Sequence, residues 1–237
     1  MTRPSASLAP LREHDPRTPA VGGGSRAHAL AEVLAALAER PRRLPSKYFY
    51  DAAGAELFER ITRLPEYYLT RTELAIMEAN VAEMAARLGP AVTLVEYGSG
   101  AGRKTRLLLD ALERPAAYVP VDVSREQLEA VALALGDEFP TVVVAPVCAD
   151  FTQPFVLPGA VRRGSRRVAY FPGSTLGNLA PGPARELLAE MRELVGCGGA
   201  ALVGTDLRKD ARVLEAAYDD AQGVTRAFNL NLLAHVN

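Results

Sequence analysis

Polar side chains and a glycine turn follow the β-rich apolar runs of this 237-residue chain, where they could bind a nucleotide. Glu96 ends the first run and leads into the loop YGSGAG, and Asp122 and Asp150 follow the next two runs. Asn178 lies in the segment FPGSTLGN after the fourth run. In open α/β sheets, ligands bind beyond the carboxyl ends of the strands. We therefore expect these residues to meet at one edge of a sheet.

The glycine loop distinguishes between two nucleotide cofactors. A dinucleotide fingerprint, GxGxxG, would place its third glycine at position 103, where this chain has Arg103. The sequence is instead ExGxGxG, with glycines at Gly98, Gly100 and Gly102. That spacing lets the backbone pass close beneath a bulkier ligand and is the form found in S-adenosylmethionine (SAM) methyltransferases. A nicotinamide oxidoreductase is therefore disfavoured.

Four more residues suit the parts of SAM. Lys104 could pair with the methionine carboxylate, and Asp122 suits the ribose hydroxyls, as acidic residues do in Rossmann domains. Asp150 could accept a hydrogen bond from the adenine N6 amine, while Phe151 offers a backbone N–H and an aromatic face. Three of them also have a structural explanation: Lys104 as a solvated lysine, Asp122 as a helix-dipole partner before the Ser124-capped helix, and Asp150 as a turn residue. Their order on successive strands favours the cofactor.

Aromatic residues cluster before the first strand. The cluster contains Tyr48, Phe49, Tyr50, Phe58, Tyr67 and Tyr68, out of 8 tyrosines and 7 phenylalanines in the chain. The structural explanation is a satellite core, which we expect for Phe49 and Phe58. Tyr50, Tyr67 and Tyr68 lie beside prolines and charged residues, which suits hydroxyls that need a partner. Such hydroxyls can bind a carboxylate, and the ring faces can stabilise a cationic amine.

Alternating elements would position these residues. Apolar runs predict strands over Val92–Glu96, Ala117–Val121, Thr141–Val147, Arg167–Phe171 and Gly199–Gly204. Helical patterns separate them, which indicates a doubly wound α/β domain with a parallel sheet covered on both faces. Upstream, Thr70 and Glu73 read as a capping box that opens a helix ending at Gly89-Pro90.

Composition excludes several classes of function. The net charge of −1 gives no basic surface for nucleic acid. Cys148 and Cys197 lack disulfide or zinc spacing, and the three histidines are scattered, so we expect no metal. No apolar run approaches the roughly 20 residues that span a bilayer, and the N-terminus lacks a signal-peptide core. These features predict a soluble cytoplasmic protein.

Longer segments carry a specific resemblance. KYFYDAAGAELFERITRLPEYYLTRTE, LVEYGSGAGRKTRLLLDAL, VPVDVS, ADF, FPGSTLGNL, LVGTDLRKD and AYDDAQGVTRAFNLNLLAHVN follow in order from about Leu44 to Asn237. They resemble the SAM-dependent histidine Nα-methyltransferases of ergothioneine biosynthesis. That family makes hercynine, the trimethylbetaine of histidine, by three methyl transfers to the α-amine.

The resemblance implies a role for eleven residues. SAM contacts are implied at Gly98, Lys104, Asp122, Asp150 and Phe151. Tyr67, Asn178 and Tyr218 would hold the carboxylate of L-histidine. Tyr50, the catalytic candidate, and the backbone at Gly173 would lie near the α-amine, and Phe58 would line the pocket.

The family continues beyond residue 237, so we interpret the chain as a fragment. The absent part would supply an acidic residue and a serine that grip the imidazole, and the last two strands of the sheet. We predict a flexible leader over 1–25, an N-terminal helical substrate-pocket segment over 26–90, a Rossmann-like SAM-binding domain over 91–206, and an incomplete substrate lobe over 207–237. An exposed edge beside the fifth strand would favour aggregation. Two alternatives stay open: methylation of another small amine or amino acid, and a non-catalytic SAM-binding module. The oligomeric state cannot be read from the sequence.

Overall fold

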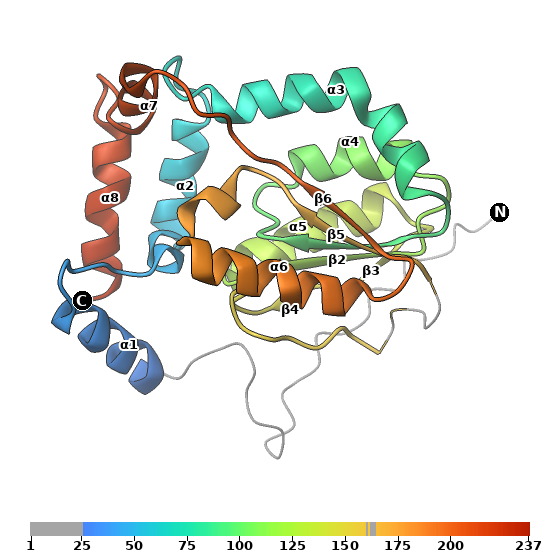
Figure 1. Cartoon of the computed structure of the whole chain (residues 1–237), viewed down its shortest axis with the longest axis horizontal. Coiled ribbons are helices and arrows are strands. Elements are labelled where there is room, and N and C mark those ends of the chain that lie inside the picture. The colour runs from blue at the N-terminus through green and yellow to red at the C-terminus, as the bar shows by residue number, and fades with distance from the viewer. Residues whose placement is uncertain (1–25, 160, 162–164) are drawn as a thin grey trace.

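The computed structural model describes residues 26–159, 161 and 165–237, and its centre is a parallel β-sheet (Figure 1). The strands are β1 (Thr93–Tyr97), β2 (Ala117–Asp122), β3 (Val143–Val144), β4 (Val147–Cys148), β5 (Arg167–Phe171) and β6 (Ala200–Val203). Their order is β3-β2-β1-β5-β6, and β4 also pairs with β2. The predicted parallel α/β sheet is confirmed, whereas the leader over 1–25 lies outside the described residues.

The third predicted strand is the one that differs. Thr141–Val147 was expected to be continuous, but it forms β3 and β4 with a break between them. Pro146 lies in the break and has no N–H with which to continue the ladder. Backbone bonds from Ala145 to Tyr118 (2.9 Å) and from Ala149 to Asp122 (3.0 Å) keep both pieces on β2.

Alternate strand residues face two separate layers of helices. Leu94, Tyr118 and Val168, which are neighbours in register, pack against α3 (Leu69–Leu88), α4 (Arg103–Ala111) and α5 (Arg125–Glu138). The intervening residues Val95 and Val119 face α6 (Pro181–Val195) and the segment that follows β4. Because the central strands are buried on both faces, they are apolar throughout, as parallel strands generally are.

The N- and C-terminal segments pack together beside the sheet (Figure 1). They comprise α1 (Arg26–Ala38), the 3-10 helix η1 (Ser46–Phe49), α2 (Ala52–Ile61), α7 (Ala211–Tyr218) and α8 (Val224–His235). Within them, Ile61 of α2 shares a core with Val224 and Phe228 of α8. The domain boundaries at residues 90 and 206 remain predictions.

The start of α3 differs from the expected capping box. The helix begins at Leu69, with Tyr68 at its N-cap and no side-chain cap bond. Thr72 N already donates to Tyr68 O (2.9 Å), so helical hydrogen bonding starts before Thr70 could cap it. The capping-box prediction is therefore wrong. Glu73 is free to reach stronger partners elsewhere, because a carboxylate gains more from a cation than from a single cap N–H.

Two short features complete the frame. Ser124 occupies the N-cap of α5 but makes no side-chain cap bond. The 3-10 helix η2 (Thr175–Asn178) follows β5 and carries Asn178 at its last position.

None of the described helices combines the length and apolarity that crossing a bilayer requires.

Candidate active site

A cavity of about 670 Å³ lies along the carboxyl ends of β1, β2 and β5. Its volume is in the range of small-molecule sites. Ten of the eleven residues singled out from the sequence line it: Tyr50, Phe58, Tyr67, Gly98, Lys104, Asp122, Asp150, Phe151, Gly173 and Asn178. Tyr218 does not line the cavity; it is half-exposed and packs edge-on behind Tyr67, with ring centroids 6.1 Å apart. The individual roles of these residues remain predictions.

The glycine loop forms the floor between β1 and α4. Gly98, Gly100 and Gly102 have φ values of +73°, +49° and +69°, a region that side-chain-bearing residues rarely adopt. A Cβ at Gly98 would also lie 3.5 Å from the Phe151 ring. Gly102 is the N-cap of α4, so the N-terminus of α4, which is the positive end of its dipole, lies at the cavity.

Asp122 holds the loop from the end of β2. Its Oδ2 accepts a bond from Gly100 N (3.4 Å), and its Oδ1 accepts one from Ser124 N (3.1 Å). Burial raises the pKa of Asp122, against the lowering effect of these backbone bonds. The carboxylate thus bonds the turn that leads into α5 and also lines the cavity.

Asp150 is held from the opposite wall. Lys47 Nζ donates to it (2.9 Å) and also pairs with Glu32 of α1 (2.8 Å). Thr152 adds bonds from its N (3.0 Å) and its hydroxyl (2.6 Å). Burial acts to raise the pKa of Asp150, but the bonds from Thr152 and Lys47 outweigh it and hold that pKa below its usual value.

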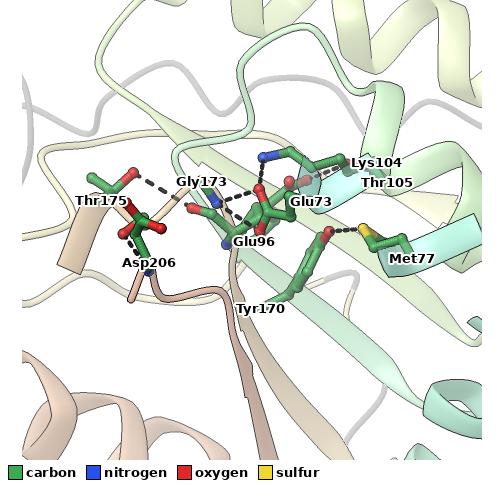
Figure 2. Close-up of polar contacts among 11 residues, drawn as sticks. Glu73, Met77, Glu96, Lys104, Thr105, Tyr170, Gly173, Thr175 and Asp206 are labelled. Atoms are coloured by element: carbon green, nitrogen blue, oxygen red, sulfur yellow. Dashed lines mark hydrogen bonds and ion pairs between the residues drawn. The ribbon is translucent and has the colours of Figure 1, made fainter. Parts of the chain in front are cut away.

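Lys104 and Glu73 form an ion pair in the cavity wall (Figure 2). Lys104 Nζ lies 2.6 Å from Glu73 Oε2. Gly173 N donates to both carboxylate oxygens at 2.9 Å. Glu73, which lies on α3, therefore connects Lys104 of α4 to Gly173 in the loop after β5.

Glu96 lies beneath the loop and is fully buried. Its Oε2 accepts bonds from Tyr118 OH (2.5 Å) and Thr105 Oγ1 (2.7 Å). Burial raises the pKa of Glu96 to about 7, although both bonds favour the ionised form.

An aromatic wall closes the other side of the cavity. Tyr50 stands edge-on to Phe58 and to Phe228 of α8, with centroids 5.7 Å apart in both pairs. Phe58 is also edge-on to Tyr67 (6.1 Å). Burial raises the pKa of Tyr50 to about 12 and that of Tyr67 further, so both present neutral hydroxyls at neutral pH. Tyr68 points elsewhere and donates to Asp206 Oδ2 (2.5 Å).

Comparison with known proteins decides the family. A family model described as "Histidine-specific methyltransferase, SAM-dependent" matches residues 29–237. This chain belongs to that family. It is 47% identical over 209 residues to the histidine N-alpha-methyltransferase of Mycolicibacterium smegmatis, and 46% over 209 residues to that of Mycobacterium tuberculosis. Each match covers 87% of this chain and 64% of the relative.

A more distant relative is named for ergothioneine biosynthesis. Ergothioneine biosynthesis protein 1 of Neurospora crassa is 33% identical over 201 residues, which cover 83% of this chain and 23% of that protein. The resemblance found in the sequence is confirmed. The chain spans slightly less than two thirds of the length of the two histidine N-alpha-methyltransferases it matches.

Three residues of this family member were missed by sequence reasoning. The sequence pattern favours a capping role for Glu73 and gives no signal that Lys47 or Phe228 belongs to the cavity. Lys47 and Asp150 are 103 positions apart, so no local motif joins them. Phe228 sits in an ordinary helical apolar pattern, which gave no signal of an aromatic wall.

Proposed function

We propose that this chain catalyses methyl transfer from SAM to the α-amine of L-histidine, which gives hercynine after three rounds. One observation carries the proposal: a single cavity joins the glycine loop and acidic strand ends to an aromatic wall with buried tyrosine hydroxyls. Membership in the histidine-specific family supports the choice of histidine. A cytoplasmic location belongs to the same proposal, since relatives are named for biosynthesis.

The residues present fit SAM. Asp122 and Asp150 lie at the ends of adjacent strands, where they would bind ribose and adenine, and Phe151 packs against the glycine loop. The hydroxyl of Ser99 is buried in the cavity wall and has no partner among the described residues, which suits a wall completed by a polar ligand. When bound, SAM would supply an electrophilic methyl group on a sulfonium.

The aromatic wall would hold the acceptor. Tyr67 and Asn178 would bind the carboxylate of histidine, and the neutral Tyr50 hydroxyl would orient the amine. The rings of Tyr50 and Phe58 would tolerate the growing quaternary ammonium through their π faces. Holding the amine nitrogen, the methyl carbon and the leaving sulfur in line is an effect worth up to roughly 7–11 kcal/mol.

Deprotonation of the amine needs no strong base. An α-amino group has an intrinsic pKa of about 8. For each unit by which this pKa exceeds the ambient pH, deprotonation costs about 1.4 kcal/mol. With a pKa of about 12, Tyr50 is not a phenolate at neutral pH. We therefore propose that the proton leaves through hydroxyls and water to solvent.

Mass spectrometry of a reaction with SAM and L-histidine tests the proposal. Trimethylhistidine and S-adenosylhomocysteine should accumulate, and Asp122→Asn should reduce both. Asp137→Asn, a matched change at an exposed site of α5, should not. Methyl transfer to another amino acid but not to histidine would show that histidine is not the substrate. S-adenosylhomocysteine binding without any transfer would favour a non-catalytic SAM-binding module.

A further inference from the structure

Glu73 lies in the wall of the cavity, next to Lys104. It lies in the second turn of α3 and reaches across to the end of β5, between Lys104 and the amide of Gly173 (Figure 2). The side chains of Glu73 and Lys104 are each 19% exposed, and both line the cavity. A largely buried pair of opposite charges therefore faces the ligand space.

The backbone makes room for this carboxylate. A Cβ at Gly204, just after β6, would lie 2.1 Å from Glu73 Oε1 and 3.3 Å from Gly173 N. Only a residue without a side chain leaves Glu73 in place. Four elements thus define its position: α3, α4, the loop after β5 and the end of β6.

Both charges keep capacity for a ligand. A carboxylate offers about four acceptor positions, and a lysine ammonium has three donors. Among the described residues, Glu73 accepts from Lys104 and from Gly173 N, and Lys104 donates to Glu73. The exposed part of the pair can therefore present an acceptor and a donor side by side.

The cavity wall is rich in acid. Seven carboxylates line it (Glu32, Glu59, Glu73, Glu96, Asp122, Asp150 and Glu186), against three cations (Lys47, Arg103 and Lys104). SAM carries a sulfonium, an ammonium and one carboxylate, so it is a net cation and matches this excess. Near Lys104, Glu96 is engaged with Tyr118 and Thr105, whereas Glu73 is paired with Lys104 itself.

We propose that Glu73 binds the α-ammonium of SAM while Lys104 binds its α-carboxylate. The pair is complementary to an amino-acid zwitterion, whose two charges sit on one carbon. The assignment rests on the proposed SAM site and adds a residue to it. The competing explanation is that Glu73 only positions Lys104.

Calorimetry with three ligands separates these explanations. S-adenosylhomocysteine has both charges, its deaminated analogue keeps only the carboxylate, and methylthioadenosine has neither. The unaltered chain should bind S-adenosylhomocysteine about ten- to a hundredfold more tightly than the deaminated analogue, as expected for a charge-assisted hydrogen bond. Glu73→Gln should remove most of that preference and leave the other two affinities unchanged. Glu78→Gln, on an exposed part of the same helix, should leave all three unchanged.

The contrary results are distinct. If Glu73→Gln weakens the deaminated analogue as much as S-adenosylhomocysteine, Glu73 acts only by positioning Lys104 and the assignment is wrong. Equal binding of these two ligands by the unaltered chain would also overturn it, and this measurement needs no variant to fold. If the unaltered chain binds none of the three ligands, the proposed SAM site itself fails.

Discussion

Two carboxylates of the site show how strongly local surroundings set the charge of a residue. Glu96 is fully buried with two hydroxyl donors, and burial dominates, so its pKa rises to about 7. Asp150 is partly buried but is bonded by Thr152 and an ammonium, and its pKa falls. Asp150 lies at the predicted adenine end, and Glu96 links β1 to Tyr118 of β2 and Thr105 of α4.

The raised pKa of Glu96 predicts a pH-dependent stability. The unfolded chain has the ordinary value of 4.5 and the folded chain about 7, so between them the folded state binds more protons. The free energy of unfolding should therefore fall as pH rises from about 4.5 to 7, by up to about 3 kcal/mol.

Urea denaturation at pH 5 and pH 7.5 measures this effect. Glu96→Gln, which can still accept the bonds from Tyr118 and Thr105, should flatten the dependence. Glu126→Gln, at an exposed site of α5, should not. A Glu96→Gln variant with the same pH slope as the unaltered chain would show that another group is responsible.

Tyr67→Phe should raise KM for histidine much more than it changes the Kd for S-adenosylhomocysteine. The change removes the hydroxyl proposed to bind the carboxylate and keeps the ring against Phe58 and Tyr218. Tyr68→Phe is the matched control, because that hydroxyl bonds Asp206 instead. Steady-state kinetics and calorimetry give the two constants, and equal losses for both ligands would contradict the assignment.

At the scale of elements, α8 supports the aromatic wall. Phe228 stacks on Phe49 (centroids 4.8 Å apart, planes 18°). Asn231 Nδ2 donates to Asp51 Oδ1 (2.7 Å), and the same oxygen caps α2 at Gly54 N (2.7 Å). Tyr50 lies between these supports, so its orientation depends on a helix that follows it by more than 170 residues.

Phe228→Ala should therefore destabilise the wall and leave the cofactor side intact. Truncating a buried phenylalanine costs about 3–5 kcal/mol. We expect a lower free energy of unfolding and weaker histidine binding, with S-adenosylhomocysteine affinity retained. Leu230→Ala, on the same helix but 58% exposed, should have little effect. Loss of S-adenosylhomocysteine binding in Phe228→Ala would mean that the aromatic wall and the proposed cofactor site are not independent.

Gly204→Ala should displace Glu73, because the new methyl group would overlap its Oε1. The carboxylate can move, so the chain should fold, but its bonds to Gly173 and Lys104 should be lost. Calorimetry should then show the same loss of preference for S-adenosylhomocysteine over its deaminated analogue as Glu73→Gln. Gly182→Ala, at a helical site with open space around it, is the matched control.

Sequence patterns predicted the elements better than the contacts between them. The apolar runs located β1, β2, β5 and β6, because parallel strands buried on both faces leave a continuous signal. Residues at strand ends were placed in the cavity by the same logic. Glu73 could not be, because its partners Lys104 and Gly173 are 31 and 100 positions away and a local capping motif competed.

At the scale of the whole molecule, β6 is the terminal strand of the sheet order. Within the described part of the chain no strand pairs with its outer side. Leu207, just beyond β6, is 77% exposed. Unpaired strand edges with apolar surroundings promote edge-to-edge association.

The 237-residue chain should therefore self-associate as its concentration rises. Ala201→Lys places a charge on the exposed position of β6 and should reduce the association. Ala130→Lys, an exposed helical site, adds the same charge elsewhere and should not. Light scattering against concentration measures both, and an equal reduction by the two variants would indicate net charge as the cause.

The aromatic wall combines residues from 49–67 with Phe228, and all six strands lie between them in the chain. Ribosomes make chains from the N-terminus, and folding begins on the part already made. On the proposed assignment, every residue that would bind the methyl donor precedes the end of β6, whereas the aromatic wall needs Phe228 of α8. We therefore expect the residues for the methyl donor to be made first, and those for the amine to be completed only when α8 has been made.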